Sequence, residues 1–127
     1  IYGIDNAYFS DTFDLSNEFE APDSNTFSVL LAHIPMYDYY KKFGTDLTLC
    51  GDTHGEVIRL PAIGPVYADG QFFPYIANNQ QPIYDKGLFE YEGGYMFITS
   101  GIGNYPFPLR MFNRPEIVCI TIAPEEN

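Results

Sequence analysis

Three apolar stretches in the first half of the chain have the length of β-strands: Ile1–Asp5, Phe27–His33 and Leu47–Cys50. Phe27–His33 is apolar at nearly every position, which is typical of a central strand buried on both faces of a sheet. Met36–Phe43 carries apolar residues at spacings of three and four, which predicts a short helix that ends at Gly44. The first half therefore predicts a strand–helix–strand unit.

The second half has a more irregular pattern of β character. Val57–Leu60 predicts a strand, and Pro61–Lys86 is a long connection of the kind that is often functional or mobile. Gly87–Tyr91 and Tyr95–Thr99 flank a short glycine-containing loop, which predicts a hairpin. Ile117–Ile122 is apolar again and is expected to close the sheet as its last strand.

Two acidic, polar segments complete the pattern. Asp11–Glu20 is expected to hold one or two helical turns, with Asp11, Thr12 or Asp14 as the cap. Ala123–Asn127 is expected to fray. We therefore predict an α/β fold with one mixed β-sheet and a few short helices, in a single partial domain that spans residues 1–127.

Composition narrows the class of partner. Hydrophobic residues make up 46% of the chain and charged residues 18%, so the chain can bury a core. The formal net charge of −11 would repel a nucleic-acid duplex, so a duplex is excluded as a partner. A phosphate substrate would need local positive charge, and metal ions are one source.

Two features of the chain bear on the location of the protein. No apolar run approaches the roughly 20 residues that span a bilayer. The chain begins with Ile1 and enters a strand at once, which we interpret as a piece cut from a longer protein. A cytoplasmic or a membrane-associated location in a bacterium is expected.

The two cysteines, Cys50 and Cys119, each lie in an apolar, strand-like run. Both are expected to be buried free thiols, and a disulfide between neighbouring strands is the alternative.

The two histidines carry the candidate chemistry. His33 and His54 each follow an apolar strand, and Asp52 lies two residues before His54. The carboxyl ends of strands are where ligands collect in α/β sheets, so these three side chains are predicted to converge on a metal region. The alternative is a hydrogen-bonded structural role for the histidines and a simple turn at Asp52.

Short motifs extend this pattern over the whole chain, in a fixed order. They are Leu30–Pro35 (LLAHIP), Gly51–Glu56 (GDTHGE), Arg59–Pro61 with Ile63–Tyr67, Gly87–Leu88 with Ser100–Gly103, Pro108–Arg110, and Arg114–Ile117. The set resembles the LLAHxP, GHTHGG, RLPxxGPxY, GLY…SRGIG and PxR…RPEI motifs of bacterial calcineurin-like metallophosphoesterases. Ile1–Asn6 resembles the strand that precedes them in that family.

The resemblance implies the C-terminal half of an αββα sandwich. It also implies hydrolysis of a phosphodiester or pyrophosphate bond by two divalent metal ions, which activate a water and stabilise the charge on phosphorus. Family motifs of the first half, such as Asp-x-His and Gly-Asn-His, are absent from this sequence. The chain alone is therefore expected to be inactive, and no residue of this half is assigned a catalytic role.

By the same resemblance, His54 would bind the first metal and His33 the second. Asp52 stands where the family has a second-metal histidine, and a carboxylate there favours Mn²⁺ or Mg²⁺ over metals of softer sites. The expected ions are Mn, Zn, Fe or Mg, with Mn favoured. Asp52 and Glu56 also leave open a degenerate, phosphoesterase-like module that binds a ligand or partner without catalysis.

Three arginines, Arg59, Arg110 and Arg114, fall in family-like segments and are predicted to bind substrate phosphate. Pairing with some of the seventeen carboxylates is the alternative for each of them. The substrate is expected to be a phosphate ester, nucleotide-linked or lipid-linked. Tyr67, Phe72, Phe73 and Tyr75 are expected either to line an apolar lip or to pack in the core.

Half a sandwich would also leave one apolar sheet face without its partner sheet. A homodimer through that exposed face is therefore expected. A β-rich structural or carbohydrate-binding module is a third, weaker possibility, because it leaves the ordered motifs unexplained.

Overall fold

The structure, a computed structural model, describes residues 1–5, 14–53, 59–60, 64–65, 67–68, 71–72, 84–103 and 110–124. Within these residues no helix is long and apolar enough to cross a membrane. Predictions for His54, Phe73, Tyr75 and most of residues 61–83 lie outside the described part.

A five-stranded sheet forms the centre of the molecule, in the order β1-β2-β3-β9-β8. Its strands are β1 (Tyr2–Gly3), β2 (Val29–Leu31), β3 (Leu47–Cys50), β8 (Gly87–Tyr91) and β9 (Gly94–Ile98). The first four strands in this order run parallel, and β8 pairs antiparallel to β9 as a hairpin. The predicted mixed α/β sheet with a few short helices is confirmed, and half of a sandwich is compatible with it.

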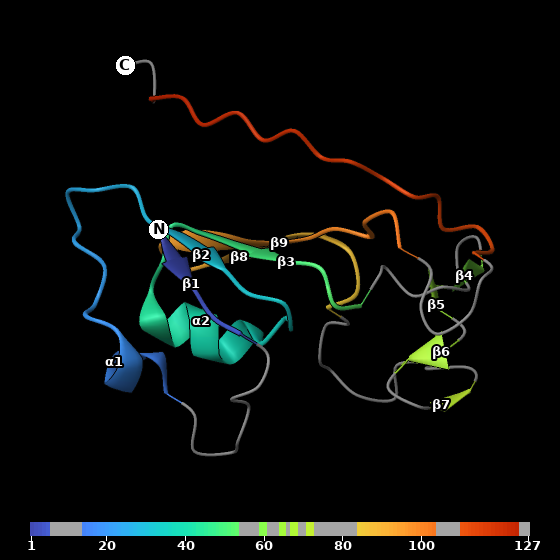
Figure 1. Cartoon of the computed structure of the whole chain (residues 1–127), viewed down its shortest axis with the longest axis horizontal. Helices are drawn as coiled ribbons and strands as arrows, with labels where there is room; N and C mark the ends of the chain where they lie inside the picture. The colour runs from blue at the N-terminus through green and yellow to red at the C-terminus, as the bar shows by residue number, and fades with distance from the viewer. Residues whose placement is uncertain are drawn as a thin grey trace.

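Two short helices pack on one side of this sheet (Figure 1). Helix α1 (Leu15–Glu18) begins after Asp14, whose carboxylate accepts a hydrogen bond from the Ser16 amide at 3.0 Å. Helix α2 (Tyr37–Phe43) ends at Gly44, which has a left-handed φ of 82°. A glycine adopts that conformation without steric cost, so the predicted end of the helix is confirmed.

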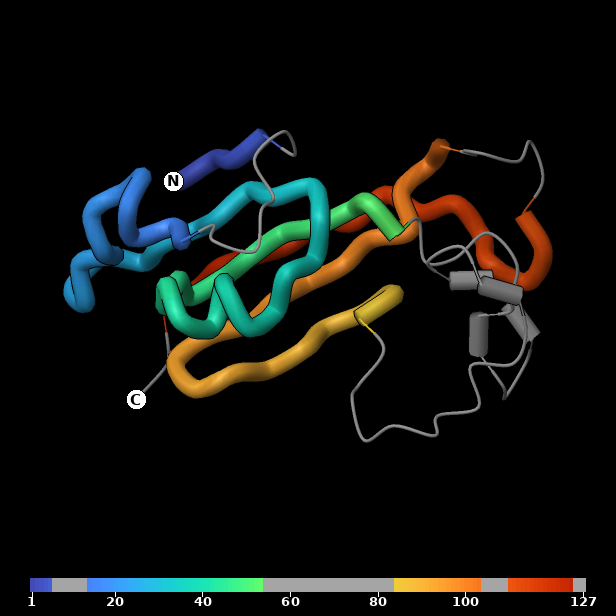
Figure 2. The backbone as a smooth tube through the Cα atoms, turned by 90° about the horizontal axis from the view of Figure 1, so that it is seen from below, coloured from blue at the N-terminus to red at the C-terminus, as the bar shows by residue number. Residues whose placement is uncertain are grey.

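The face of the sheet that carries the helices is the core of the chain. Register aligns Leu30, Thr48 and Met96 across β2, β3 and β9, and all three are fully buried. Ile98 from β9 and Tyr40 from α2 are also fully buried. The tube in Figure 2 is seen from this side, with α2 lying over the strands.

The opposite face is open. Leu31, Tyr95 and Leu88 point to this side, and their exposed fractions are 47%, 44% and 61%. The prediction that Phe27–His33 is buried on both faces is therefore wrong. Only the helix side of β2 is covered, because no second layer of described residues packs against the other side.

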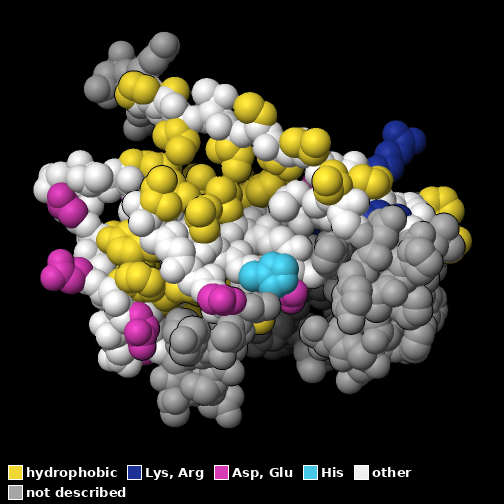
Figure 3. Space-filling view, in the orientation of Figure 1, with side chains coloured by type: hydrophobic (Ala, Val, Ile, Leu, Met, Phe, Trp, Pro, Cys, Tyr) yellow, Lys and Arg dark blue, Asp and Glu magenta, His cyan; other side chains and the backbone are white. Residues whose placement is uncertain are grey.

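The C-terminal segment, residues 116–124, runs in extended form along this open face (Figures 1 and 2). A cavity of about 490 Å³ separates the segment from the sheet, with Leu47, Leu88 and Tyr95 on one side and Thr121 and Ile122 on the other. Hydrophobic side chains gather on both sides of this gap (Figure 3).

The prediction that Ile117–Ile122 closes the sheet is therefore wrong, since among the described residues this segment joins no ladder. Its apolar side chains lie exposed instead. Cys119 is exposed with them, which contradicts the predicted burial, whereas Cys50 is buried as predicted, and both thiols are free.

Four further strands pair outside the main sheet. β4 (Arg59–Leu60) pairs antiparallel with β5 (Gly64–Pro65), and β6 (Tyr67–Ala68) pairs antiparallel with β7 (Gln71–Phe72). The predicted strand at Val57–Leu60 is thus found in its second half, and its first half lies outside the described residues. The predicted connection contains short hairpins of its own.

Candidate metal-binding edge

Two strand ends bring His33 and Asp52 together at one edge of the sheet. β2 and β3 are parallel neighbours, and each of these residues follows the last residue of its strand by two positions. The backbone holds the two ends together, because the His33 carbonyl accepts from the amides of Gly51 at 3.2 Å and Asp52 at 3.0 Å. Their meeting at the carboxyl edge follows from this topology.

The side chains also meet. His33 Nε2 lies 3.0 Å from Asp52 Oδ1, and the two side chains are 49% and 44% exposed. Two ligand atoms that each lie about 2.1 Å from one ion are about 3.0 Å apart when the ligand–ion–ligand angle is a right angle. The imidazole nitrogen and the carboxylate oxygen therefore fit neighbouring positions on one divalent ion, and the same distance fits a direct hydrogen bond.

These two residues are part of the predicted ligand set. His54, the third predicted ligand, lies outside the described residues, and within the described part no three His, Cys, Asp or Glu side chains cluster as a metal site. The assignment of His33, Asp52 and His54 as metal ligands stays a prediction.

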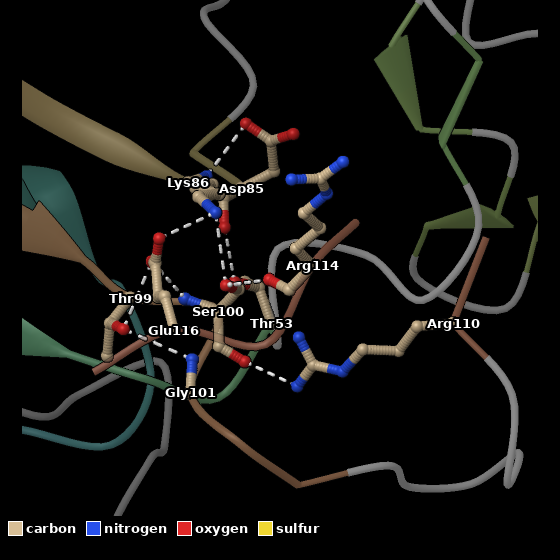
Figure 4. A network of polar contacts seen from close by, with 9 residues as sticks. All are labelled: Thr53, Asp85, Lys86, Thr99, Ser100, Gly101, Arg110, Arg114 and Glu116. Carbon is tan, nitrogen blue, oxygen red and sulfur yellow. Dashed lines mark hydrogen bonds and ion pairs between the residues drawn. The ribbon is translucent and has the colours of Figure 1, made fainter. Parts of the chain in front are cut away.

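Two of the predicted phosphate-binding arginines lie beside the same edge of the sheet (Figure 4). Arg110 donates from Nη2 to the Ser100 carbonyl at 2.6 Å and from Nε to the Gly103 carbonyl at 3.0 Å. Its guanidinium thus supports the loop after β9. The Arg114 side chain is exposed, and its backbone carbonyl accepts from Ser100 Oγ at 3.2 Å.

The third arginine, Arg59, is in β4, and its side chain is outside the described part. The phosphate-binding role of all three arginines stays a prediction.

A polar network that was not predicted fixes the C-terminal segment to this edge (Figure 4). Lys86 Nζ lies 2.8 Å from Glu116 Oε2 and 3.1 Å from Ser100 Oγ. Glu116 Oε1 accepts from the Ser100 amide at 2.9 Å and from Thr99 Oγ1 at 3.2 Å. The hydrogen bond from Lys86 is the largest cause that lowers the pKa of Glu116, to about 2.

Thr53 links this network to the candidate ligands. Its hydroxyl donates to the Asp85 carbonyl at 2.5 Å, and Asp85 directly precedes Lys86. The sequence signals this network only in that Ser100 and Glu116 fall within the family-like motifs SGIG and RPEI, which do not predict an ion pair with Lys86.

Beneath the strand ends, the environment is apolar. Cys50 is buried, and its burial raises the pKa of the thiol to about 12, so it is a poor nucleophile and metal ligand at neutral pH. Its Sγ lies 3.8 Å from the Ile34 carbonyl, to which the Tyr40 hydroxyl also donates at 2.5 Å.

Comparison with known proteins gives two relatives. The chain is 32% identical over 99 residues to a protein of Bacillus subtilis named "Uncharacterized metallophosphoesterase YkuE", a match that covers 76% of this chain and 31% of that protein. It is 29% identical over 104 residues to "Phosphodiesterase YaeI" of Escherichia coli, with 81% of this chain and 35% of that protein covered.

The chain thus spans about a third of the length of the curated relatives it matches. No family model matches the chain. No solved structure matches it significantly. The names of the two relatives support the metallophosphoesterase superfamily as the family of this chain.

Proposed function

We propose that this chain is the C-terminal half of a metal-dependent phosphoesterase domain and supplies part of its two-metal centre. The observation that carries the proposal is the His33–Asp52 pair, with 3.0 Å between Nε2 and Oδ1 at the carboxyl edge of two parallel strands. The names of the two relatives point to the same chemistry. The remaining ligands would come from His54 and from the other part of the protein.

Each residue of the pair has a distinct task in this proposal. His33 offers a neutral nitrogen and Asp52 a charged oxygen, a mixed set that suits Mn²⁺, the preferred ion of the proposal. Two divalent ions, when bound, would supply an activated water and positive charge for the phosphoryl group. The residues themselves hold position, because the His33 carbonyl ties both strand ends together through the amides of Gly51 and Asp52.

The substrate would be a phosphodiester or a pyrophosphate, nucleotide-linked or lipid-linked. Arg114 is the best placed of the arginines to contact it, because its side chain is exposed beside the candidate edge and no ion pair engages it within the described part of the chain. A local cation matters in a chain with a net charge of −11.

Hydrolysis of bis-p-nitrophenyl phosphate by the full-length protein with Mn²⁺ tests the proposal. His33→Ala and Asp52→Ala are expected to lower kcat/KM at least about a hundredfold, since even outer-shell partners of a metal ligand are worth 10–100-fold. Asp38→Asn, an exposed carboxylate in the first turn of α2, is the control and should leave the rate unchanged. An inactive full-length protein under Mn²⁺, Mg²⁺, Zn²⁺ and Fe²⁺ would overturn the proposal.

A second candidate function is a module that binds a ligand or partner without catalysis. It is favoured by Asp52 at a position where a histidine is expected, and by the direct contact that satisfies this carboxylate through His33. Asp52→His separates the two functions. If the full-length protein is inactive and Asp52→His creates activity, the module is a degenerate enzyme.

The open face of the sheet carries a proposal about the isolated chain. Leu31, Leu88 and Tyr95 lie exposed on it beside the apolar side chains of the C-terminal segment. We expect a second copy to cover this surface when the chain is alone, and the partner half of the sandwich to cover it in the full-length protein. Sedimentation equilibrium of the isolated chain should give a dimer, and a monomer at high micromolar concentration would exclude the homodimer.

A further inference from the structure

Tyr40 lies directly beneath the candidate metal-binding edge. It is the fourth residue of α2, and its side chain is fully buried between the helix and the sheet. Its hydroxyl donates to the carbonyl of Ile34 at 2.5 Å. Ile34 is the residue after His33, so a core side chain holds the backbone of the loop that carries the candidate ligand.

The same loop has further contacts, to the start of α2 and to the end of β3. The Ile34 carbonyl also accepts from the Met36 amide at 3.1 Å, and Cys50 Sγ approaches it at 3.8 Å. One residue earlier, the His33 carbonyl accepts from the amides of Gly51 and Asp52. Tyr40 therefore holds the backbone at Ile34, and the adjacent residue, His33, is held to Gly51 and Asp52. The His33–Asp52 side-chain contact of 3.0 Å lies next to these bonds.

We propose that Tyr40 is a positioning residue that holds the His33 loop in the geometry needed for His33 and Asp52 to bind one divalent ion. The proposal rests on the proposed function. A metal site needs its ligands fixed to within about 0.5 Å, and loops reach that precision only when supporting groups lock them. The Tyr40 hydroxyl is a side-chain donor that reaches this loop from the buried face of α2.

Tyr91 provides a matched comparison. It is also a buried tyrosine, 5% exposed, whose hydroxyl donates to a backbone carbonyl, that of Thr45, at 2.7 Å. Thr45 precedes β3, so this bond lies at the end of the strand opposite to Asp52. The Tyr91 hydroxyl also lies 3.3 Å from Thr48 Oγ1, so Tyr91→Phe removes two hydrogen bonds, whereas Tyr40→Phe removes the one to Ile34. Of the two hydroxyls, only that of Tyr40 contacts the loop that carries His33.

The experiment compares Tyr40→Phe with Tyr91→Phe in the full-length protein. Mn²⁺ affinity, measured by isothermal titration calorimetry, is expected to fall about tenfold in Tyr40→Phe, the lower end of the range for outer-shell groups, and to change less than about twofold in Tyr91→Phe. Thermal unfolding of the metal-free variants should show a loss of stability in Tyr91→Phe at least as large as in Tyr40→Phe, because each variant keeps its buried ring and Tyr91→Phe also loses the contact with Thr48.

A second readout does not depend on metal. Amide hydrogen exchange at Gly51 and Asp52, which donate to the His33 carbonyl, is expected to quicken in metal-free Tyr40→Phe and to stay as in the wild type in Tyr91→Phe. Equal Mn²⁺ affinity in the wild type and Tyr40→Phe, or unchanged exchange at both amides, would overturn the proposal.

The two readouts separate this inference from the proposed function. If the wild type binds no Mn²⁺ but Tyr40→Phe alone loosens both amides, the positioning contact holds and the metal site fails. If the wild type binds Mn²⁺ and both tyrosine variants weaken it equally, metal binding stands and the effect is general destabilisation, which overturns the role of Tyr40.

Discussion

The two faces of the five-stranded sheet carry similar side chains in different surroundings. On the helix side, Leu30, Met96 and Ile98 are fully buried. On the other side, Leu31 and Leu88 are 47% and 61% exposed, although they are as apolar as their neighbours. Leu30 and Leu31 are adjacent in sequence and differ only in the side of the strand to which they point.

The difference separates what stabilises this chain from what it offers to a partner. Burial of a leucine side chain contributes roughly 1.5–3 kcal/mol, so the helix side supplies the core that holds the sheet. On the open side, exposed side chains such as Leu31 and Leu88 do not make this contribution. They would make it if another layer covered this face and buried them, as the second sheet of a sandwich would.

The largest expected effect comes from Leu30→Ala compared with Leu88→Ala. Leu30→Ala should lower the free energy of unfolding by about 2–5 kcal/mol, because it leaves a cavity in the core. Leu88→Ala, at an exposed position, should change it by less than about 0.5 kcal/mol in this chain. Urea denaturation measures both.

The same pair also tests what covers the open face. If a partner sheet covers the open face in the full-length protein, Leu88→Ala should lower the free energy of unfolding of that protein by about 2 kcal/mol or more. An equally small loss in both contexts would show that the open face stays open.

A smaller effect is expected from Gly94→Ala, at the start of β9 on the helix side. A Cβ at Gly94 would lie 2.7 Å from Tyr91 Cε2 and 2.9 Å from the Asp46 carbonyl oxygen, and it would contact the Thr45 carbonyl even more closely. Because backbone atoms must move, we expect a loss of about 1–3 kcal/mol. Gly3→Ala is the control, since nothing lies within 4 Å of its Cβ, and an equal loss there would contradict the steric explanation.

The anchor of the C-terminal segment should respond to acid. Hydrogen bonds and charge lower the pKa of Glu116 from 4.5 to about 2 in the folded chain. Its contribution is therefore fully present above about pH 4.5 and is lost as the pH falls from there toward 2. Limited proteolysis across this pH range should show earlier cleavage within residues 117–124.

Glu116→Gln should reproduce this release at pH 7, with a loss of about 0.5–1 kcal/mol for a partly exposed ion pair. Glu92→Gln, an exposed carboxylate in the hairpin turn, is the control. Cleavage of Glu116→Gln at the wild-type rate would mean that other contacts hold the segment.

The last prediction compares the reactivity of the two thiols and involves no change in the fold. Cys119 lies exposed in the C-terminal segment, whereas Cys50 is buried on the helix side with its pKa raised to about 12. In the native chain at pH 8, a disulfide reagent such as DTNB should modify Cys119 at least about a hundredfold faster than Cys50. Comparable rates would show that the helix side opens readily.

Elements controlled by local sequence were predicted well. The end of α2 at Gly44, the hairpin of β8 and β9 and the strand at Leu47–Cys50 are all present, and Asp14 is the cap among the three candidates that were named. Each depends on residues close in the chain: a glycine with positive φ, a carboxylate two residues before an amide, or a short run of apolar side chains.

Elements that need a distant partner in the sequence were predicted poorly. Ile117–Ile122 has the composition of a strand but joins no ladder within the described part of the chain, and Cys119 is exposed with it. Apolar composition indicates that a segment can be buried, but burial itself requires a neighbour that covers it.

The candidate site shows the same division. The sequence by itself determined that His33 and Asp52 each follow an apolar strand, because strand length and apolar character are local properties. Only the tertiary structure decided that β2 and β3 are parallel neighbours and that His33 Nε2 lies 3.0 Å from Asp52 Oδ1. It also decided that the Tyr40 hydroxyl supports the loop that carries His33. Register and side-chain contacts arise when segments far apart in the chain pack together, and no local pattern specifies them.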